Sequence, residues 1–156
     1  MKISDILSPD VIEVNLDVKD KEDSLKKIID IASHSSKILD LQKVSDTIFE
    51  REKLVSTGVG KGFAIPHGKT DAISDIVAAF VITKAPIDFD SIDAEPVRFI
   101  FLLVGKETLL NTHIKLLSRI SRLMNKDEFR AKLLTAATKE EVLKMFKDEE
   151  QNYFDI

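Results

Sequence analysis

The residues best suited to do chemistry are His67 and the glycine-rich segment before it. Three of the chain's five glycines fall between Gly58 and Gly62, and a fourth, Gly68, follows the histidine directly. Pro66 restricts the backbone just before His67, whereas Gly68 leaves it free just after. These neighbours hold an imidazole at a defined place and leave little bulk beside it to block a partner. We therefore interpret His67 as a nucleophile that briefly carries a phosphoryl group.

A second histidine, His113, is open to two interpretations. It lies on the apolar face of a predicted helix, near the helix start, where a histidine is most often a core residue. However, a helix N-terminus disfavours an imidazolium and attracts anions, so a neutral His113 could donate a hydrogen bond to phosphate. It also follows a strand-to-helix junction, the edge where α/β folds bind ligands. The third histidine, His34, ends an earlier predicted helix and is interpreted as a surface residue.

Arg51 and two hydroxyl residues flank the glycine-rich segment. Arg51 ends a predicted helix just before it, so the simplest interpretation is a solvated helix terminus. If the following loop folds back, Arg51 brings a planar, permanently charged guanidinium to an anion. Ser56 and Thr57 are ordinary loop residues unless a phosphoryl group needs hydroxyl donors nearby.

Three other motifs fail on spacing. Residues 68–70 resemble the end of a P-loop, but Phe63 stands where the first glycine is required. The acidic residues within 88–95 resemble a calcium loop, yet Ile92 and Asp93 occupy the places of an oxygen ligand and a glycine. The histidines lack metal-ligand spacing. We therefore expect no metal site and no nucleotide cradle.

The composition limits the class of protein. The chain has 156 residues, of which 44% are hydrophobic and 32% charged, as in a soluble globular domain. It has no cysteine, which excludes disulfides and thiolate chemistry. The longest apolar run, Ile76 to Ile82, is too short to span a bilayer, and residues 1–5 lack the apolar core of a secretory signal. The net charge of −4 argues against nucleic acid as a partner. We expect a cytoplasmic protein.

The hydrophobic periodicity predicts the elements that must position these residues. Strands are expected over 11–16, 63–66, 76–83 and 97–104, and helices over 20–37, 41–53, 109–124, 129–134 and 142–146. Asp20 and Thr138 are expected to cap the first and last of these helices. The strands over 76–83 and 97–104 are almost continuously apolar, which is typical of strands covered on both faces. The fold class is therefore α/β, a single domain with a mixed β-sheet flanked by α-helices, followed by a loose tail over 148–156.

A basic stripe on the helix over 109–124 continues just beyond its end, opposite the apolar face, and we favour a solvated surface over a docking site for an acidic partner. Its residues are Lys115, Arg119, Arg122 and Lys126.

Several motifs together resemble a known family, the enzyme IIA domains of the mannitol/fructose class in the bacterial phosphoenolpyruvate-dependent sugar phosphotransferase system. The motifs are Arg51 to Leu54, Ser56 to Gly60, Ala64 to Gly68, Pro86 to Phe89, Pro96 to Phe101, and His113 with the helix after it. The resemblance covers nearly the whole chain. Its main departure is Phe63, where the family more often has a small aliphatic residue; we interpret this as a packing change.

The resemblance implies a phosphocarrier domain over 1–147. It implies that His67 accepts a phosphoryl group on its ε nitrogen from the phosphohistidine of the carrier protein HPr, and passes it to a cysteine of a separate enzyme IIB. His113 matches the family's second active-site histidine and Arg51 its active-site arginine, while Thr57 matches a position close to the phosphohistidine. Neither cofactor nor metal is implied, because the donor is itself a phosphohistidine.

Two alternatives remain beside a carrier for sugar uptake. The first is a regulatory protein of the same fold, as in the nitrogen-related branch, in which the phosphorylation state of His67 controls partner proteins without sugar transport. The second is a small-molecule binding module that uses the glycine-rich loop. Any association with a membrane permease would run through the IIB and IIC components.

Overall fold

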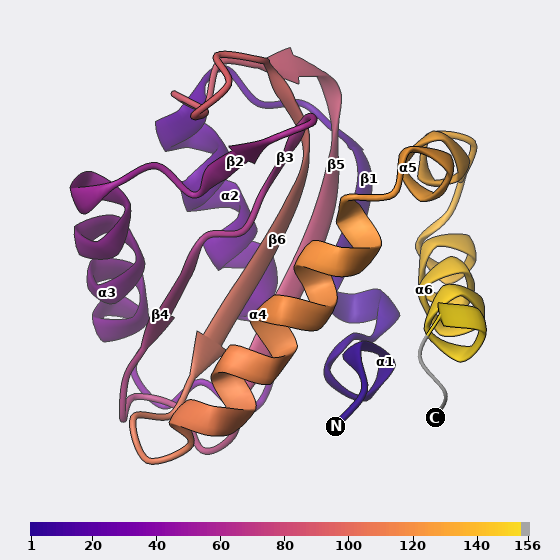
Figure 1. Ribbon diagram of the computed structural model, residues 1–156. Helices are drawn as coiled ribbons and strands as arrows, with labels where there is room; N and C mark the ends of the chain where they lie inside the picture. Colours follow the sequence, from indigo (N-terminus) through magenta and orange to yellow (C-terminus); the bar gives the residue numbers. More distant parts are fainter. Residues whose placement is uncertain (154–156) are drawn as a thin grey trace.

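The computed structural model describes residues 1–153 and has one mixed β-sheet at its centre (Figure 1). Its strand order is β1-β5-β6-β3-β2, with β4 also paired to β6. The strands are β1 (Ile12–Leu16), β2 (Gly58–Gly60), β3 (Phe63–Ala64), β4 (His67–Lys69), β5 (Val77–Ile87) and β6 (Val97–Gly105). β5 and β6 form an antiparallel pair, whereas β1 is parallel to β5, and β3 and β4 are parallel to β6. This confirms the predicted fold class.

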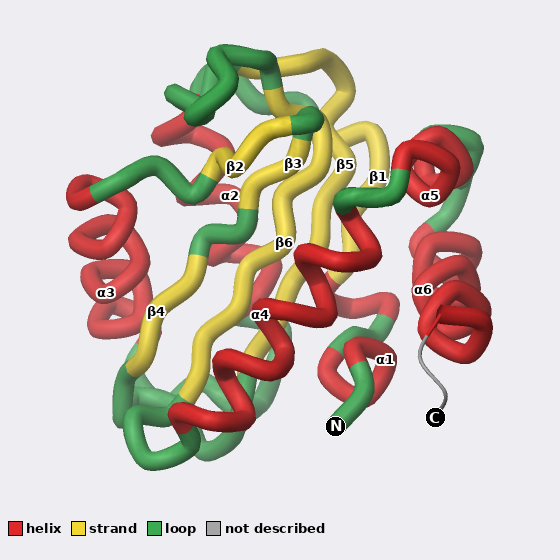
Figure 2. Tube along the Cα trace, in the orientation of Figure 1, coloured by secondary structure: helices red, strands yellow, loops and turns green. Residues whose placement is uncertain are grey.

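Helices cover both faces of the sheet (Figure 2). They are α1 (Ile3–Ile6), α2 (Lys21–Ala32), α3 (Leu41–Leu54), α4 (Leu110–Met124), α5 (Asp127–Leu133) and α6 (Lys139–Tyr153), with one 3-10 turn, η1 (Pro9–Val11). In the view of Figure 1, α4 crosses in front of the sheet, α2 lies behind it, and α3 flanks β4. The two central strands are therefore buried on both sides, as their continuous apolar sequence predicts.

A cluster of phenylalanines joins the sheet to the C-terminal helices. Phe146 of α6 packs edge-on against Phe80 of β5, Phe101 of β6 and Phe129 of α5, with ring centroids 5.0, 5.8 and 5.2 Å apart. Such edge-to-face pairs contribute about 0.5–1.5 kcal/mol each beyond their buried area. The cluster fixes α5 and α6 against the side of the sheet away from β4.

The predicted helix caps are present. The side chain of Asp20 accepts a hydrogen bond from the Asp23 amide at 2.8 Å, and Thr138 accepts one from the Glu141 amide at 3.2 Å. These bonds satisfy N–H groups that have no partner inside the helix.

The predicted end of the first long helix was wrong, because α2 ends at Ala32 and not near Lys37. The amides of His34 and Ser35 bond three residues back, to Ile31 and Ala32, so the chain tightens into a turn after the helix. The Ser33 hydroxyl also donates a hydrogen bond to the Asp30 carbonyl. Serine side chains that bond the local backbone in this way compete with helix continuation.

The predicted loose tail was also wrong over the residues that the structure describes. Helix α6 continues through Tyr153, and Glu150 is 1% exposed. Its carboxylate accepts hydrogen bonds from the amides of Ile3 at 2.6 Å and Ser4 at 2.9 Å, so it caps the first helix of the chain. The rest of the predicted tail, residues 154–156, lies outside the described residues. Within residues 1–153 no helix is long and apolar enough to cross a bilayer.

Candidate functional site

Strand β4 holds His67 at the sheet face beside α3. Its three residues pair in parallel with β6, and His67 lies opposite Leu103. The Leu103 amide also donates to the carbonyl of Pro66 at 3.0 Å, which fixes the peptide just before the histidine. At Gly68 a side chain would bring a Cβ within 2.8 Å of Thr47 Cγ2. The glycine after the histidine therefore allows α3 to pack directly on β4.

A single hydrogen bond sets the chemistry of the His67 ring. Its Nδ1 lies 2.7 Å from the carbonyl oxygen of Ile65. A carbonyl oxygen only accepts, so Nδ1 carries the proton and donates, and the lone pair of the neutral ring is on Nε2. The unprotonated nitrogen of His67 is therefore Nε2.

The surroundings of His67 lower its pKa below the ordinary value. Burial of the ring is the largest cause, and the positive charges of Arg51 and Lys69 act in the same direction. The hydrogen bond to Ile65 and the negative charge of Glu52 oppose the shift. A lowered pKa keeps His67 neutral, and hence nucleophilic, near pH 7.

His113, in the first turn of α4, lies beside His67 with the ring centroids 5.9 Å apart and the planes tilted by 50°. It is 3% exposed, and its Nδ1 faces the backbone of Gly105, where an added Cβ would be 2.4 Å away. Within residues 1–153 this Nδ1 has no hydrogen-bond partner. A lone pair is less costly than an N–H at such a place, which assigns the proton to Nε2.

The pKa of His113 is lowered to about 4 by burial, then by the charge of His67 when that ring is protonated, and by Lys69. The ring is therefore neutral near pH 7 and keeps one N–H to donate. The two interpretations of His113 are thus compatible, because the residue is buried in the core and lines the cavity of His67.

The two histidines line a cavity between α3, β4 and the start of α4. Its lining residues are Thr47, Arg51, His67, Gly68, Lys69, Glu107, Leu110, His113, Ile114 and Leu117. The structure thus brings together three of the residues expected from the sequence, His67, His113 and Arg51. Arg51 donates one hydrogen bond, from Nη1 to the Val55 carbonyl at 3.1 Å, and a guanidinium has four further N–H donors. The cavity combines a neutral imidazole with two cations, which attract anions.

Sequence reasoning missed Lys69 as a site residue. It lies two positions after His67 on β4, so both side chains emerge on the same face of the strand. Lys69 lines the cavity, and its charge lowers the pKa of both histidines. Because residues two apart in a strand share a face, the position of Lys69 relative to His67 could have indicated its role from the sequence.

The expected role of Thr57 as a hydroxyl donor to phosphate conflicts with the structure. Thr57 is buried, and its hydroxyl and its amide both donate to Oε1 of Glu52, at 3.1 and 2.9 Å. A threonine hydroxyl has one hydrogen to donate, and this one is already used. Thr57 is also absent from the lining of the His67 cavity. It contributes to the structure of the loop and not to the cavity.

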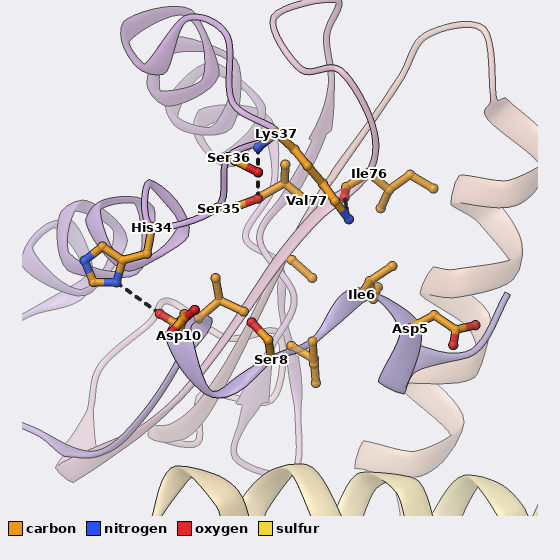
Figure 3. A pocket seen from close by; sticks show the side chains of 13 residues that line it. Asp5, Ile6, Ser8, Asp10, His34, Ser35, Ser36, Lys37, Ile76 and Val77 are labelled. Atoms are coloured by element: carbon orange, nitrogen blue, oxygen red, sulfur yellow. Dashed lines mark hydrogen bonds between the residues drawn. The ribbon is translucent and has the colours of Figure 1, made fainter.

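A second cavity lies at the start of β5, between the residues after α2 and the N-terminal segment (Figure 3). His34 lines it, exposed as predicted, with Nδ1 3.0 Å from the Asp10 carbonyl. Among the described residues this cavity shares no lining residue with the cavity of His67. Within residues 1–153, no group of three His, Asp or Glu side chains is placed to hold a metal ion.

Comparison with known proteins decides the family. Residues 5–149 match the family described as "Phosphoenolpyruvate-dependent sugar phosphotransferase system, EIIA 2". The chain belongs to this family. As an enzyme IIA it is a phosphotransferase component that works through a phosphohistidine intermediate. The resemblance inferred from the sequence motifs is confirmed.

Enzyme IIA relatives of two kinds are similar to the chain. It is 34% identical over 140 residues to the fructose-specific EIIA component of Haloferax volcanii, covering 90% of this chain and 91% of that protein. It is 36% identical over 135 residues to a nitrogen regulatory protein of Bradyrhizobium diazoefficiens, covering 85% and 86%. It is also 34% identical over 143 residues to the fructose-specific EIIABC component of Bacillus subtilis, covering 92% of this chain but only 22% of that protein.

The fold of the enzyme IIA chain matches a solved structure of the nitrogen-related kind. The nitrogen regulatory protein IIA-Ntr of Neisseria meningitidis superposes with a TM-score of 0.85 at 32% identity, covering 92% of this chain and 98% of that one. Both sugar-specific and nitrogen-regulatory relatives therefore share this domain.

Proposed function

We propose that this enzyme IIA is a histidine phosphocarrier in sugar uptake. His67 accepts a phosphoryl group from phospho-HPr and passes it to a cysteine of a separate enzyme IIB. The 156 residues contain no cysteine, so the acceptor thiol lies outside them. The carrier acts in the cytoplasm and reaches a membrane permease only through the IIB and IIC components.

One observation carries the proposal: the hydrogen bond from Nδ1 of His67 to the Ile65 carbonyl leaves Nε2 unprotonated. The lone pair of Nε2 attacks the phosphorus of the donor phosphohistidine as the P–N bond to the donor breaks, and the donor imidazole departs with that electron pair. In the second step the thiolate of the acceptor attacks the same phosphorus, and the bond to Nε2 breaks. The first step leaves His67 phosphorylated on Nε2, and the second returns it to its neutral, Nδ1-protonated form.

The remaining residues of the cavity stabilise the charge on the transferring group. Arg51 and Lys69 bring two cations to the cavity, and the N–H of the neutral His113 adds a donor. Phosphoryl transfer depends mainly on such positioning and electrostatic stabilisation.

The rim of the cavity fits protein partners. Leu109, Leu110 and Ile114 are 41%, 45% and 53% exposed at the start of α4. Leu110 and Ile114 also line the cavity, which places apolar side chains beside the nucleophile. Exposed apolar side chains around a polar centre are typical of protein–protein interfaces. A donor and an acceptor that are both proteins need this open, apolar rim.

A second function is favoured by the comparisons with the nitrogen-related relatives. In that reading the phosphorylation state of His67 controls partner proteins and no sugar is moved. The IIA-Ntr structure from Neisseria meningitidis and the nitrogen regulatory protein of Bradyrhizobium diazoefficiens match this chain over most of their own length. Passage of phosphate to an enzyme IIB distinguishes the two functions, because only the sugar carrier requires it.

The test is phosphorylation in a reconstituted system. The protein is incubated with phosphoenolpyruvate, enzyme I and HPr, and its intact mass is measured before and after addition of enzyme IIB. We expect an acid-labile gain of one phosphoryl group that IIB then removes. His67→Ala should show no gain, and the matched control His34→Ala should behave as the parent protein. No gain in the parent protein with active HPr would contradict the carrier function.

A further inference from the structure

A continuous path of hydrogen bonds connects a buried carboxylate to the His67 ring. Oε1 of Glu52 accepts from the Thr57 amide at 2.9 Å, and the Thr57 carbonyl accepts from the Ile65 amide at 3.1 Å. The Ile65 carbonyl in turn accepts from Nδ1 of His67 at 2.7 Å. The path runs from the last turn of α3, through the loop before β2, to the peptide that sets the tautomer of the nucleophile.

Glu52 is itself held firmly in place. It is 7% exposed, and its Oε1 lies 3.1 Å from Nζ of Lys21 in the first turn of α2. The same Nζ lies 4.8 Å above the ring of Phe89, a cation–π contact that fixes the ammonium. A buried carboxylate with a paired cation and two further donors is costly to move. Glu52 thus ties α2 and α3 to the start of the glycine-rich segment.

The Ile65 carbonyl needs this support because few bonds hold its segment. Ile65 and Pro66 lie between β3 and β4, and Pro66 has no N–H to donate. The segment is held on one side by the bond from the Ile65 amide to Thr57, and on the other by the bond from Leu103 to Pro66. Among residues 1–153, Thr57 is the one of these two anchors that accepts support from a side chain, since its amide and hydroxyl both donate to Glu52.

We propose that Glu52 is a positioning residue for His67. By fixing Thr57, it fixes the Ile65 carbonyl that keeps the proton on Nδ1 and the lone pair on Nε2. The inference rests on the proposed function in so far as Nε2 is the reacting atom. Free neutral imidazole favours the opposite tautomer, with the proton on Nε2, so a mobile Ile65 carbonyl would leave much of the protein unable to attack phosphorus. Oε2 of Glu52 has no hydrogen-bond partner among residues 1–153, so the whole contact depends on Oε1.

The test compares the His67 tautomer in variants at position 52. Nitrogen-15 NMR of the imidazole at neutral pH reports which ring nitrogen carries the proton in the unphosphorylated protein. The parent protein should show a protonated Nδ1 and an unprotonated Nε2. Glu52→Ala removes the anchor and should give a mixture of tautomers, with transfer from HPr slowed by roughly 10- to 100-fold, as expected for a misplaced reacting group. Glu52→Gln retains an acceptor oxygen and should restore the parent tautomer.

Two further variants make the result specific. Glu52→Asp keeps the charge but withdraws the carboxylate from Thr57, and should mix the tautomers even if Glu52→Ala does not fold. Glu50→Ala removes an exposed carboxylate from the same helix and should leave both tautomer and rate unchanged. A folded Glu52→Ala or Glu52→Asp protein with the parent tautomer would overturn the inference.

The readouts separate this inference from the proposed function. The tautomer is measured without any partner protein, so it remains decisive even if the parent protein takes no phosphate from HPr. Slowed transfer with an unchanged tautomer would assign Glu52 a general structural role and would also overturn the inference.

Discussion

At the scale of single residues, the chemistry depends on which ring nitrogen of His67 is unprotonated, and a backbone carbonyl determines this tautomer. The Ile65 carbonyl accepts a hydrogen bond from Nδ1–H, while burial, together with the charges of Arg51 and Lys69, lowers the pKa and keeps the ring neutral. His113 contributes one N–H from a buried ring. His67 and His113 could be picked out from the sequence because each had unusual neighbours, and the structure places both in one cavity. Lys69 could have been found from its position two residues after His67 on the same strand, whereas the role of Glu52 depends on its contacts with Thr57 and Lys21 and could not.

Lys69 provides a test of the electrostatics at this scale. Its positive charge lowers the pKa of both histidines, so Lys69→Met should raise both pKa values. Removal of a cation should also slow phosphoryl transfer from HPr, by roughly 10-fold or more. NMR titration of the ring protons and a stopped-flow transfer assay measure the two effects. Lys84→Met, which removes an exposed lysine from β5, is the matched control; equal pKa values in both variants would contradict the assignment.

At the scale of elements, the site is made by three segments that are distant in the sequence. Strand β4 carries His67, the end of α3 brings Arg51, and the start of α4 brings His113. The periodicity predicted these elements because long apolar strands and capped helices have strong local signals. It did not predict where α2 ends, because that boundary depends on serine bonds to the local backbone. It also missed the role of Thr57, whose hydroxyl is used by Glu52 on the neighbouring helix.

The contact between β6 and α4 is tested at Gly105. A methyl group there would lie 2.4 Å from Nδ1 of His113, so Gly105→Ala must displace that ring. We expect phosphorylation of His67 to survive while transfer slows, as in His113→Ala, for which a loss of roughly 10²–10³ is typical of one preorganised donor. The double variant should be no slower than His113→Ala alone, because both changes remove the same interaction. Additive losses in transfer kinetics would contradict this account.

At the scale of the whole molecule, the two ends of the described chain support each other. Glu150 of α6 caps α1, and Phe146 joins α6 to the sheet, so residues 148–153 are part of the folded domain. The sequence of this segment is polar and resembles a loose tail. Its burial could not be predicted, because the partners of Glu150 lie at the opposite end of the sequence.

Removal of the Glu150 cap tests this long-range connection. Glu150→Ala leaves the buried amide of Ile3 without a partner and should lower the free energy of unfolding by about 1–3 kcal/mol. Gln151→Ala, at an exposed position of the same helix, should leave it unchanged. Urea denaturation measures both. A Glu150→Ala protein as stable as the parent would show that the cap contributes little.

The buried His113 links stability to pH. Its pKa of about 4 in the folded protein lies below the value of about 6.5 in the unfolded chain, so the unfolded state binds the proton first as pH falls. This contribution is intact above pH 6.5 and is lost as pH falls through the folded pKa, up to about 3 kcal/mol in all. His113→Asn should flatten the fall in unfolding free energy between pH 7 and pH 5. An identical pH profile in the variant would contradict the lowered pKa.

The most direct test of the central claim locates the phosphoryl group on the protein. Protein labelled with nitrogen-15 at its histidines is phosphorylated through HPr, and NMR identifies the nitrogen that is bonded to phosphorus. The account predicts phosphorus on Nε2 of His67, with Nδ1 still protonated against the Ile65 carbonyl. Phosphorus on Nδ1 of His67, or on His113, would contradict it.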